Sequence, residues 1–336
     1  MTGQRLPTPE ELLEHAVVLS LPMRTRFRGI TTREVMIVEG PAGWGEFGPF
    51  VEYDDEESAA WLAAGIEAAY HGAPPARRDR VPINATVPAV PASEVAGILA
   101  RFPGARTAKV KVAEPGQTLD DDVARVAATR ELIGRVRVDA NGKWDVAQAI
   151  TALRAIGDLE YAEQPCATVE ELAAVRRAVD VPIAADESIR KATDPMRVVA
   201  AEAADIAVLK VAPLGGMRAV LTLAEEIGLP VVISSALDSA VGIAAGVAAA
   251  AALPELPFAC GLGTGSLFTG DVADGGTPDD GHLRPRWFGP GDLDVPSTLC
   301  AAEDRRRWWH ERLRRAHAVL TARGHRLGSG SFPAGG

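Results

Sequence analysis

The sequence contains eight short apolar runs, and segments with helical periodicity separate them. The runs are rich in Val, Ile and Ala, a composition typical of parallel strands that are buried on both faces. The expected strands are Ile83–Val87, Ala108–Val112, Val136–Asp139, Leu159–Glu163, Pro182–Ala185, Ile206–Lys210, Val231–Ser234 and Phe258–Gly261. This alternation predicts an α/β protein with a parallel barrel of (β/α)8 type, a modified TIM barrel, although an open parallel sheet has the same pattern.

Helix-starting residues stand at regular places between these runs. Thr118 precedes three acidic residues, Asp120–Asp122, which suit the positive end of a helix. Asp145 is a second candidate N-cap, and Thr168 with Glu171 forms the pattern of a capping box. Helices are therefore expected to connect consecutive strands.

The two ends of the chain have a different pattern from the barrel. Three runs separated by turn residues predict an antiparallel sheet, and an Ala-rich helix follows: Val17–Leu21, Arg33–Glu39, Trp44–Glu46 and then Glu56–Tyr70. A last helix is expected over Glu303–Leu320. We therefore expect an α+β capping domain from residues 1–80, with contributions from 271–336, on a barrel of residues 81–270.

The last helix carries several arginines, which raises the question of a nucleic-acid surface. Trp309, Leu313, Ala316 and Leu320 recur at helical spacing, so the pattern favours a helix packed on the body with its arginines in solvent. The net charge of −10 also disfavours nucleic acid and anionic membranes as partners.

The composition and the N-terminus indicate a cytoplasmic protein. The three cysteines are far apart and form neither a CxxC pattern nor a disulfide framework. The first residues lack the apolar core of a signal peptide, and the longest nearly apolar run, Val241–Leu253, is too short to cross a bilayer. No exposed apolar stripe stands out, so a monomer is favoured over a homo-oligomer.

Charged residues recur at the carboxyl ends of the expected strands. Lys109 and Lys111 lie on one face of the second strand, and the following strands end at or beside Asp139, Glu163, Asp186 and Lys210. The steps from Asp139 to Glu163, Asp186 and Lys210 are 24, 23 and 24 residues. One charged strand end is ordinarily a solvated terminus, but barrel closure would direct all of these at one cavity, where barrel enzymes place their chemistry.

Three converging carboxylates need a cation, because otherwise they repel one another and are partly protonated. A site with oxygen ligands and without Cys or His suits Mg²⁺. The six histidines lie outside the expected strands, which disfavours a zinc site or a Ser-His-Asp triad. A lysine beside a metal ion and a second ammonium group gives up its proton more readily, so it is a candidate base for abstracting a proton next to a carboxylate.

Several spaced motifs resemble the enolase superfamily, muconate-cycloisomerase-like branch. They are "AKVKV", "VRVDANGKWD", "YAEQPC", "IAADES" and "AVLKVAPLGG", and "GWGEFGPF" is similar to the family's capping domain. Within the branch, the motifs are most similar to those of the o-succinylbenzoate synthases of actinobacterial type. The resemblance therefore covers the whole chain.

The resemblance implies an Mg²⁺-dependent lyase of menaquinone (vitamin K2) biosynthesis. Its small carboxylate substrate, 2-succinyl-6-hydroxy-2,4-cyclohexadiene-1-carboxylate, would undergo syn dehydration to o-succinylbenzoate. Lys111 would be the base, Lys109 would tune it, and Lys210 would place positive charge on the other side of the intermediate. The metal ligands would be Asp139, Glu163 and Asp186, with Mn²⁺ as a substitute for Mg²⁺.

Further residues are implied as substrate-binding or supporting groups. Asn141 matches the family's DxN motif. Two interpretations of Arg137 remain open: it contacts the site, or it forms a structural ion pair in the barrel. The ends of the last two strands would receive the succinyl tail through Ser234, Ser235, Gly261, Gly263 and Thr264. The loop Met23–Gly29 either closes over the site or is a basic hairpin tip.

Two other functions remain open at this stage. An N-acylamino acid racemase or dipeptide epimerase of the same superfamily would use Lys111 and Lys210 as bases on opposite faces. The resemblance implies that such racemases and epimerases often have an acidic residue near the end of the last strand, so the glycine found there, Gly263, disfavours an α-ammonium substrate. A non-catalytic barrel that only binds a ligand is the more distant alternative, and the intact lysines and carboxylates argue against it.

Overall fold

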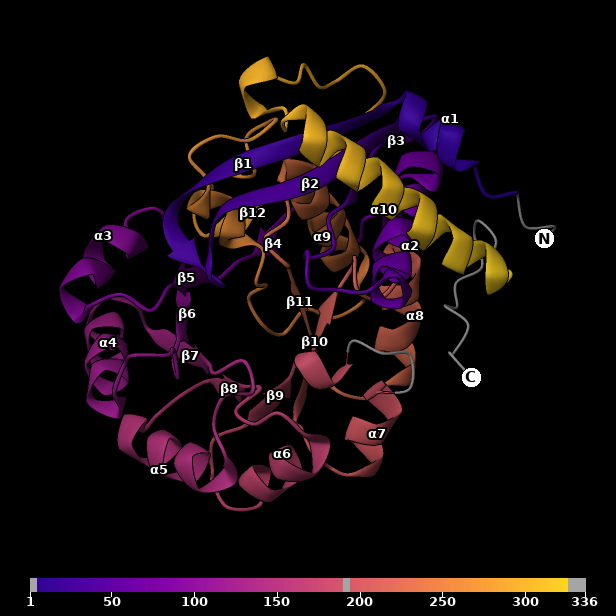
Figure 1. Cartoon of the computed structure of the whole chain (residues 1–336). Helices are drawn as coiled ribbons and strands as arrows, with labels where there is room; N and C mark the ends of the chain where they lie inside the picture. The colour runs from indigo at the N-terminus through magenta and orange to yellow at the C-terminus, as the bar shows by residue number, and fades with distance from the viewer. Residues whose placement is uncertain (1–4, 190–193, 326–336) are drawn as a thin grey trace.

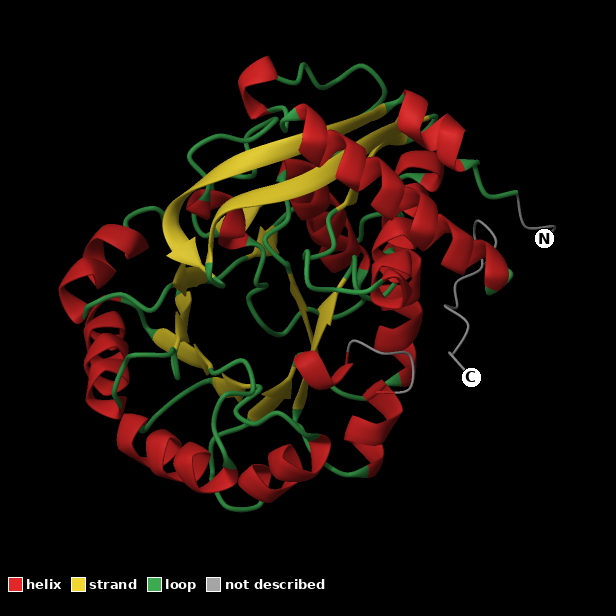
Figure 2. Ribbon diagram, in the orientation of Figure 1, coloured by secondary structure: helices red, strands yellow, loops and turns green. Residues whose placement is uncertain are grey.

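The computed structural model describes residues 5–189 and 194–325, and its centre is a ring of parallel strands (Figures 1 and 2). Seven strands pair in consecutive order from β5 to β11. They are β5 (Ala85–Val87), β6 (Thr107–Lys111), β7 (Arg135–Asp139), β8 (Tyr161–Glu163), β9 (Ile183–Ala185), β10 (Ile206–Lys210) and β11 (Val231–Ser234). The predicted barrel strands, which alternate with helices, are thus confirmed in order and direction.

Two isolated bridges close the ring in place of a full eighth strand. Cys260 pairs in parallel with Ile83, and Gly261 pairs in parallel with Ser234. The Gly261 N–H donates to the Ile233 carbonyl at 2.8 Å. The expected strand Phe258–Gly261 is therefore shorter than predicted. A short antiparallel pair, β4 (Val81–Pro82) with β12 (His282–Leu283), lies beside this closure.

Helices surround the barrel and connect its strands (Figure 2). They are α3 (Val95–Leu99), α4 (Leu119–Leu132), α5 (Val146–Ile156), α6 (Val169–Arg176), α7 (Asp194–Ala200), α8 (Met217–Glu226) and α9 (Ala240–Ala252). The predicted caps are confirmed, because Thr118, Asp145 and Thr168 each accept a hydrogen bond from a first-turn backbone N–H. Among the described residues, no helix combines the length and the apolar character that a membrane span requires.

The barrel interior is divided into an apolar layer and a charged layer. An apolar cluster contains Tyr161, Ala184, Ile206, Val208 and Val232, and their chain neighbours face the surrounding helices instead. Because strand side chains alternate, Glu163, Asp186 and Lys210 lie on this same inner face, each two positions beyond a member of the cluster. The apolar cluster therefore lies directly below the charged strand ends.

A three-stranded antiparallel sheet lies along one side of the ring of strands, and the end of its β1–β2 hairpin approaches the ring near β5 (Figure 1). It consists of β1 (Ala16–Phe27), β2 (Ile30–Gly40) and β3 (Gly43–Phe47), and it packs with α1 (Pro9–Glu14), α2 (Asp55–His71) and α10 (Glu303–Ala322). Trp309 of α10 is fully buried, as predicted, and its ring lies 5.7 Å from that of Phe47. The α+β cap predicted from the sequence is thus present.

Polar contacts join this cap to the barrel. The buried Glu46 carboxylate of β3 accepts a hydrogen bond of 2.9 Å from the Ser239 N–H at the start of α9. Arg33 of β2 donates to the Leu237 carbonyl at 3.1 Å. A carboxylate at a helix N-terminus is stabilised by the unpaired amides there. These contacts hold the cap against the loop that follows β11.

Candidate functional site

The six charged residues predicted from the sequence meet at the carboxyl ends of β6 to β10. The register pairs Lys111 with Asp139, and Asp139 with Glu163, so these three residues lie at one level of the barrel. Asp186 follows β9 directly, and Lys210 is the last residue of β10. The Asp139 and Glu163 side chains are only 1% exposed, so their charges need partners inside the protein.

Lysines and carboxylates form ion pairs with each other within this centre. The Lys109 ammonium lies 2.6 Å from Glu163 and 3.1 Å from Asp139. The Lys111 ammonium lies 2.6 Å from Asp139, and the Lys210 ammonium lies 2.5 Å from Asp186. Three ammonium groups therefore balance three buried carboxylates, with Lys111 and Lys210 at opposite ends of the carboxylate row.

These contacts and the burial of the site shift the pKa values of its members in different directions. Burial would lower the pKa of Lys109, but Glu163 and Asp139 raise that pKa well above its usual value. Burial would raise the pKa of Asp139, but Lys111 and Lys109 hold it far below its usual range. Burial, together with Asp139 and Asp186, raises the pKa of Glu163 to about 7 against the effect of Lys109. The carboxylates around Lys109 therefore favour its protonated form.

The donor chemistry of this centre fits a hard divalent cation. Carboxylate oxygens come from three neighbouring strands at one buried rim, which is the ligand type that Mg²⁺ takes. In the part of the chain that the structure describes, no set of three or more acidic, His or Cys side chains already has metal-binding geometry. The reason is that Asp139, Glu163 and Asp186 face the lysine ammonium groups.

Asn141 joins Lys111 to a residue that the sequence interpretation missed. The Lys111 ammonium donates to Asn141 Oδ1 at 2.7 Å, and Asn141 Nδ2 donates to Glu187 Oε1 at 3.1 Å. Asn141 adopts a left-handed backbone with a φ of 48°, which asparagine tolerates better than most residues. Glu187 stands within the quoted motif "IAADES", so its position beside Asp186 was its only signal.

Gln164 is a second residue that the sequence interpretation missed. Its buried side-chain oxygen accepts from the backbone N–H groups of Asp186 at 3.0 Å and of Ser188 at 3.2 Å. Its side-chain nitrogen donates to the Cys166 carbonyl at 2.9 Å and to the Ser188 hydroxyl at 2.8 Å. The amide thereby holds the backbone that carries Asp186, and no periodicity or charge pattern announces such a role.

Arg137 lies below the charged centre, in the barrel floor. Its guanidinium pairs with Glu160, donates to the Ala259 carbonyl at 2.7 Å and lies 4.5 Å from the centre of the Tyr161 ring. The side chain is fully buried. Of the two interpretations left open by the sequence, these contacts are those of the structural ion pair.

The predicted tail-binding residues lie together where β11 meets the closing segment. The Ser235 hydroxyl donates to the Gly261 carbonyl at 2.8 Å and lies 2.7 Å from the Thr264 hydroxyl. A Cβ atom on Gly261 would lie 2.4 Å from the Ser234 hydroxyl, and one on Gly263 would lie 2.9 Å from the Phe102 ring. Glycine is therefore needed here for close packing. Contact of these residues with a substrate stays a prediction.

The tip of the β1–β2 hairpin reaches the site with an aromatic residue. The Lys111 ammonium lies 5.4 Å from the centre of the Phe27 ring, a distance that allows a cation–π interaction. Strands β1 and β2 extend to Phe27 and Ile30, so the expected loop is a tight hairpin. Arg28 instead turns away and stacks on Phe50, 3.8 Å from the ring centre.

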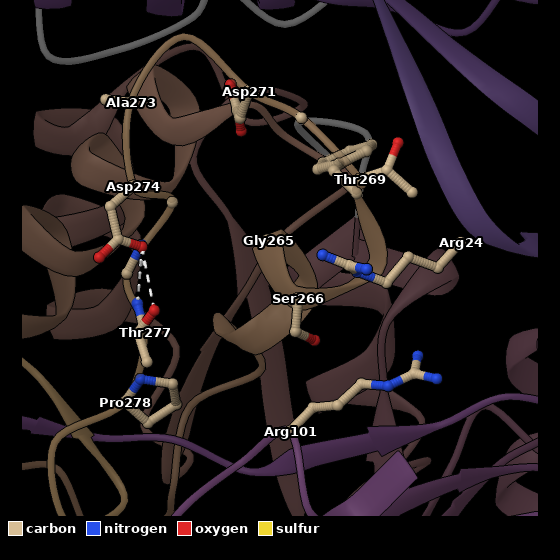
Figure 3. A pocket seen from close by; sticks show the side chains of 14 residues that line it. Arg24, Arg101, Gly265, Ser266, Thr269, Asp271, Ala273, Asp274, Thr277 and Pro278 are labelled. Carbon is tan, nitrogen blue, oxygen red and sulfur yellow. Dashed lines mark hydrogen bonds between the residues drawn. The ribbon is translucent and has the colours of Figure 1, made fainter. Parts of the chain in front are cut away.

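A polar groove of about 230 Å³ lies beside the hairpin, between β1 and the segment after the closing bridges (Figure 3). Arg24 and Arg101 line one side near Ser266, and Asp271 and Asp274 line another. Both acids accept hydrogen bonds from backbone amides, and neither arginine forms an ion pair with another of the described residues. The groove is therefore basic on one side, and the three site lysines do not line it.

Two family models match the sequence, one for each domain of the same enzyme family. A model described as "Enolase C-terminal domain-like" matches residues 94–291, which is more than half of the chain. A model described as "Enolase N-terminal domain-like" matches residues 18–69. The chain belongs to the enolase superfamily.

Curated relatives within the superfamily match almost the whole chain. An o-succinylbenzoate synthase of Mycobacterium bovis (strain BCG / Pasteur 1173P2) is 64% identical over 318 residues, covering 94% of this chain and 97% of that protein. An o-succinylbenzoate synthase of Mycobacterium ulcerans (strain Agy99) is 63% identical over 319 residues, with coverage of 94% and 97%.

Solved structures of the superfamily share the fold. Muconate lactonizing enzyme from Pseudomonas putida has a TM-score of 0.69 at 22% identity and covers 84% of this chain and 96% of its own. N-succinyl Arg/Lys racemase from Bacillus cereus ATCC 14579 has a TM-score of 0.70 at 20% identity, with coverage of 86% and 97%. At these identities the similarity concerns the fold alone.

Proposed function

We propose that this enolase superfamily member is an o-succinylbenzoate synthase, a lyase that removes water from 2-succinyl-6-hydroxy-2,4-cyclohexadiene-1-carboxylate. The similarity to the mycobacterial enzyme, 64% over 94% of the chain, is the observation that carries the proposal. The buried lysine–carboxylate centre supports it, because this reaction needs a base and concentrated positive charge.

Lys111 is the base in this proposal. Its ammonium lies at the edge of the network with its side chain 12% exposed, whereas Lys109 lies deeper between Asp139 and Glu163. In its neutral form, Lys111 Nζ takes the proton α to the ring carboxylate. The resulting ammonium then gives a proton to the departing hydroxyl on the same face, so water leaves and the ring becomes aromatic.

The other two lysines supply positive charge. The raised pKa of Lys109 keeps it protonated, so it holds its neighbouring carboxylates and balances charge around Lys111. Lys210 stands at the other end of the carboxylate row, paired with Asp186. From there its ammonium stabilises the planar anionic intermediate from the side opposite the base.

Asp139, Glu163 and Asp186 would hold Mg²⁺, with Mn²⁺ as a substitute. A bound ion would supply charge that stabilises the carboxylate of the substrate as its α-proton leaves. Asn141 would support Asp139, to which its backbone N–H donates at 3.1 Å.

Substrate-tail contacts and the division of the chain are parts of the same proposal. Ser234, Ser235, Gly261, Gly263 and Thr264 would form the wall that receives the succinyl group. Residues 1–80 with 271–336 would form the cap, and 81–270 the catalytic barrel. The protein would be a cytoplasmic monomer, and its net charge of −10 disfavours nucleic acid and anionic membranes as partners.

The direct test is turnover of the cyclohexadiene substrate by the purified protein with Mg²⁺, followed by formation of the aromatic product. We expect turnover that a chelator abolishes and that Lys111→Ala reduces by at least 10²-fold. A parallel incubation of an N-succinyl amino acid in D₂O tests the racemase alternative. Rapid exchange of its α-proton, without dehydration of the cyclohexadiene, would refute the proposed function and favour racemase activity instead.

A further inference from the structure

Glu187 reaches Lys111 through one amide side chain. Asn141 Oδ1 lies 2.7 Å from the Lys111 ammonium, and Asn141 Nδ2 lies 3.1 Å from Glu187 Oε1. These residues follow different strands, since Asn141 comes after β7 and Glu187 belongs to the short 3-10 helix after β9. The contact therefore crosses the end of β8, which stands between β7 and β9 in the sheet.

The chemistry of the three groups gives this contact a direction. An ammonium group only donates hydrogen bonds, an ionised carboxylate only accepts them, and an amide has one end of each kind. Because the amide nitrogen of Asn141 faces Glu187, its oxygen is the end that faces Lys111. The reversed amide would place donor against donor at Lys111 and acceptor against acceptor at Glu187.

A base of this kind needs such an anchor. A lysine side chain has about 2 kcal/mol of rotamer entropy, and a misplacement of about 1 Å can cost about 10²-fold in rate. Asp139 and Asn141 accept from Lys111 at 2.6 and 2.7 Å, so two of its three N–H positions are fixed. The third position is left for the proton that is exchanged with the substrate.

We propose that Glu187 is a positioning residue that aims Lys111 at the substrate by fixing the orientation of the Asn141 amide; this inference rests on the proposed function. Glu187 acts through another residue and does not contact the reacting atoms. Its role differs from that of a structural carboxylate, because it depends on which end of the amide faces the lysine.

Variants that exchange the hydrogen-bond acceptor and donor between Asn141 and Glu187 test the proposal. Glu187→Gln removes the obligatory acceptor, and Asn141→Asp places two carboxylates against each other. The double variant, Asn141→Asp with Glu187→Gln, restores an acceptor towards Lys111 and a donor towards that acceptor. Glu170→Gln is the matched control, because its side chain is 74% exposed on α6.

For dehydration, we expect each single variant to lose about 10- to 100-fold in kcat with KM changed less than threefold. The kcat of the double variant should be at least tenfold higher than that of the less active single variant. The kcat of Glu170→Gln should equal that of the unaltered protein. If the double variant instead shows the product of the two single losses, the two residues act independently and the proposal is wrong.

A second measurement does not require turnover. Acetylation of lysines by an amine reagent, followed by peptide mass spectrometry, reports how firmly each Nζ is held. In Glu187→Gln, Lys111 should react at least fivefold faster, while Lys143, whose side chain is 33% exposed, stays constant. An unchanged Lys111 rate overturns the proposal even if the protein dehydrates the substrate. A faster rate in a protein without dehydratase activity supports the positioning role and refutes only the proposed function.

Discussion

Replacing Gln164 by leucine should cause a large loss of stability for a conservative change in volume. The side chain is fully buried and takes part in four hydrogen bonds, two accepted from backbone N–H groups and two donated. At about 1 kcal/mol for each hydrogen bond lost, the sum is about 4 kcal/mol. The additional apolar surface of leucine offsets about 1 kcal/mol of this.

The expected net loss is therefore about 3 kcal/mol, a large share of the 5–15 kcal/mol that is typical of folded proteins. Urea unfolding followed by circular dichroism measures it. The matched control is Gln148→Leu, because Gln148 is exposed and its side-chain oxygen accepts one hydrogen bond, from Asp145 N at 3.0 Å. That control should lose about 1 kcal/mol or less.

The same variant should also lose activity, since Gln164 holds the backbone N–H of the proposed metal ligand Asp186. A loss of stability below about 1 kcal/mol for Gln164→Leu would refute the reasoning. It would mean that the four partners find other hydrogen bonds, or water, at no cost. Equal losses for Gln164→Leu and Gln148→Leu would refute it as well.

Three further predictions concern the cap and the rim of the site. Phe27→Ala should lower kcat/KM by about tenfold, because it uncovers Lys111, whereas Phe27→Leu should retain most of the activity. The double variant Arg24→Ala with Arg101→Ala tests whether these arginines steer the anionic substrate electrostatically. At low salt its kcat/KM should be about three- to tenfold lower and should depend less on salt, while kcat is unchanged. Equal kcat/KM in the variant and the unaltered protein would contradict steering. Burial raises the pKa of Glu46 from 4.5 to about 8, so its contribution to stability is full below pH 4.5 and is lost as the pH rises towards 8. Thermal unfolding of Glu46→Gln across this range should show a flatter pH dependence than the unaltered protein.

Local patterns in the sequence predicted most of the architecture. The strand β10 and the start of β11 fall where the apolar runs placed them, because buried parallel strands leave a continuous apolar signal. The caps of α4 and α6 were equally readable, since a capping box is a contact over three residues. The eighth strand was overestimated, because an apolar run does not reveal how many of its residues find a partner in the ladder.

The spacing of charges along the chain likewise predicted which side chains meet. Strand side chains alternate and consecutive strands lie side by side, so residues about 24 positions apart reach one rim. Their pairing was beyond this reasoning. Which carboxylate lies 2.6 Å from Lys109, and therefore which lysine stays protonated, depends on distances across three strands.

Thus the sequence by itself determined the order of strands and helices, the helix caps and the collection of lysines and carboxylates at one end of a barrel. Only the tertiary structure decided that Phe27 covers Lys111, that Arg137 belongs to the barrel floor and that Glu187 reaches the site through Asn141. The physical reason is range. Periodicity and capping act over a few residues of chain, whereas the direction of a hydrogen bond between two loops is set by the packing of the whole barrel.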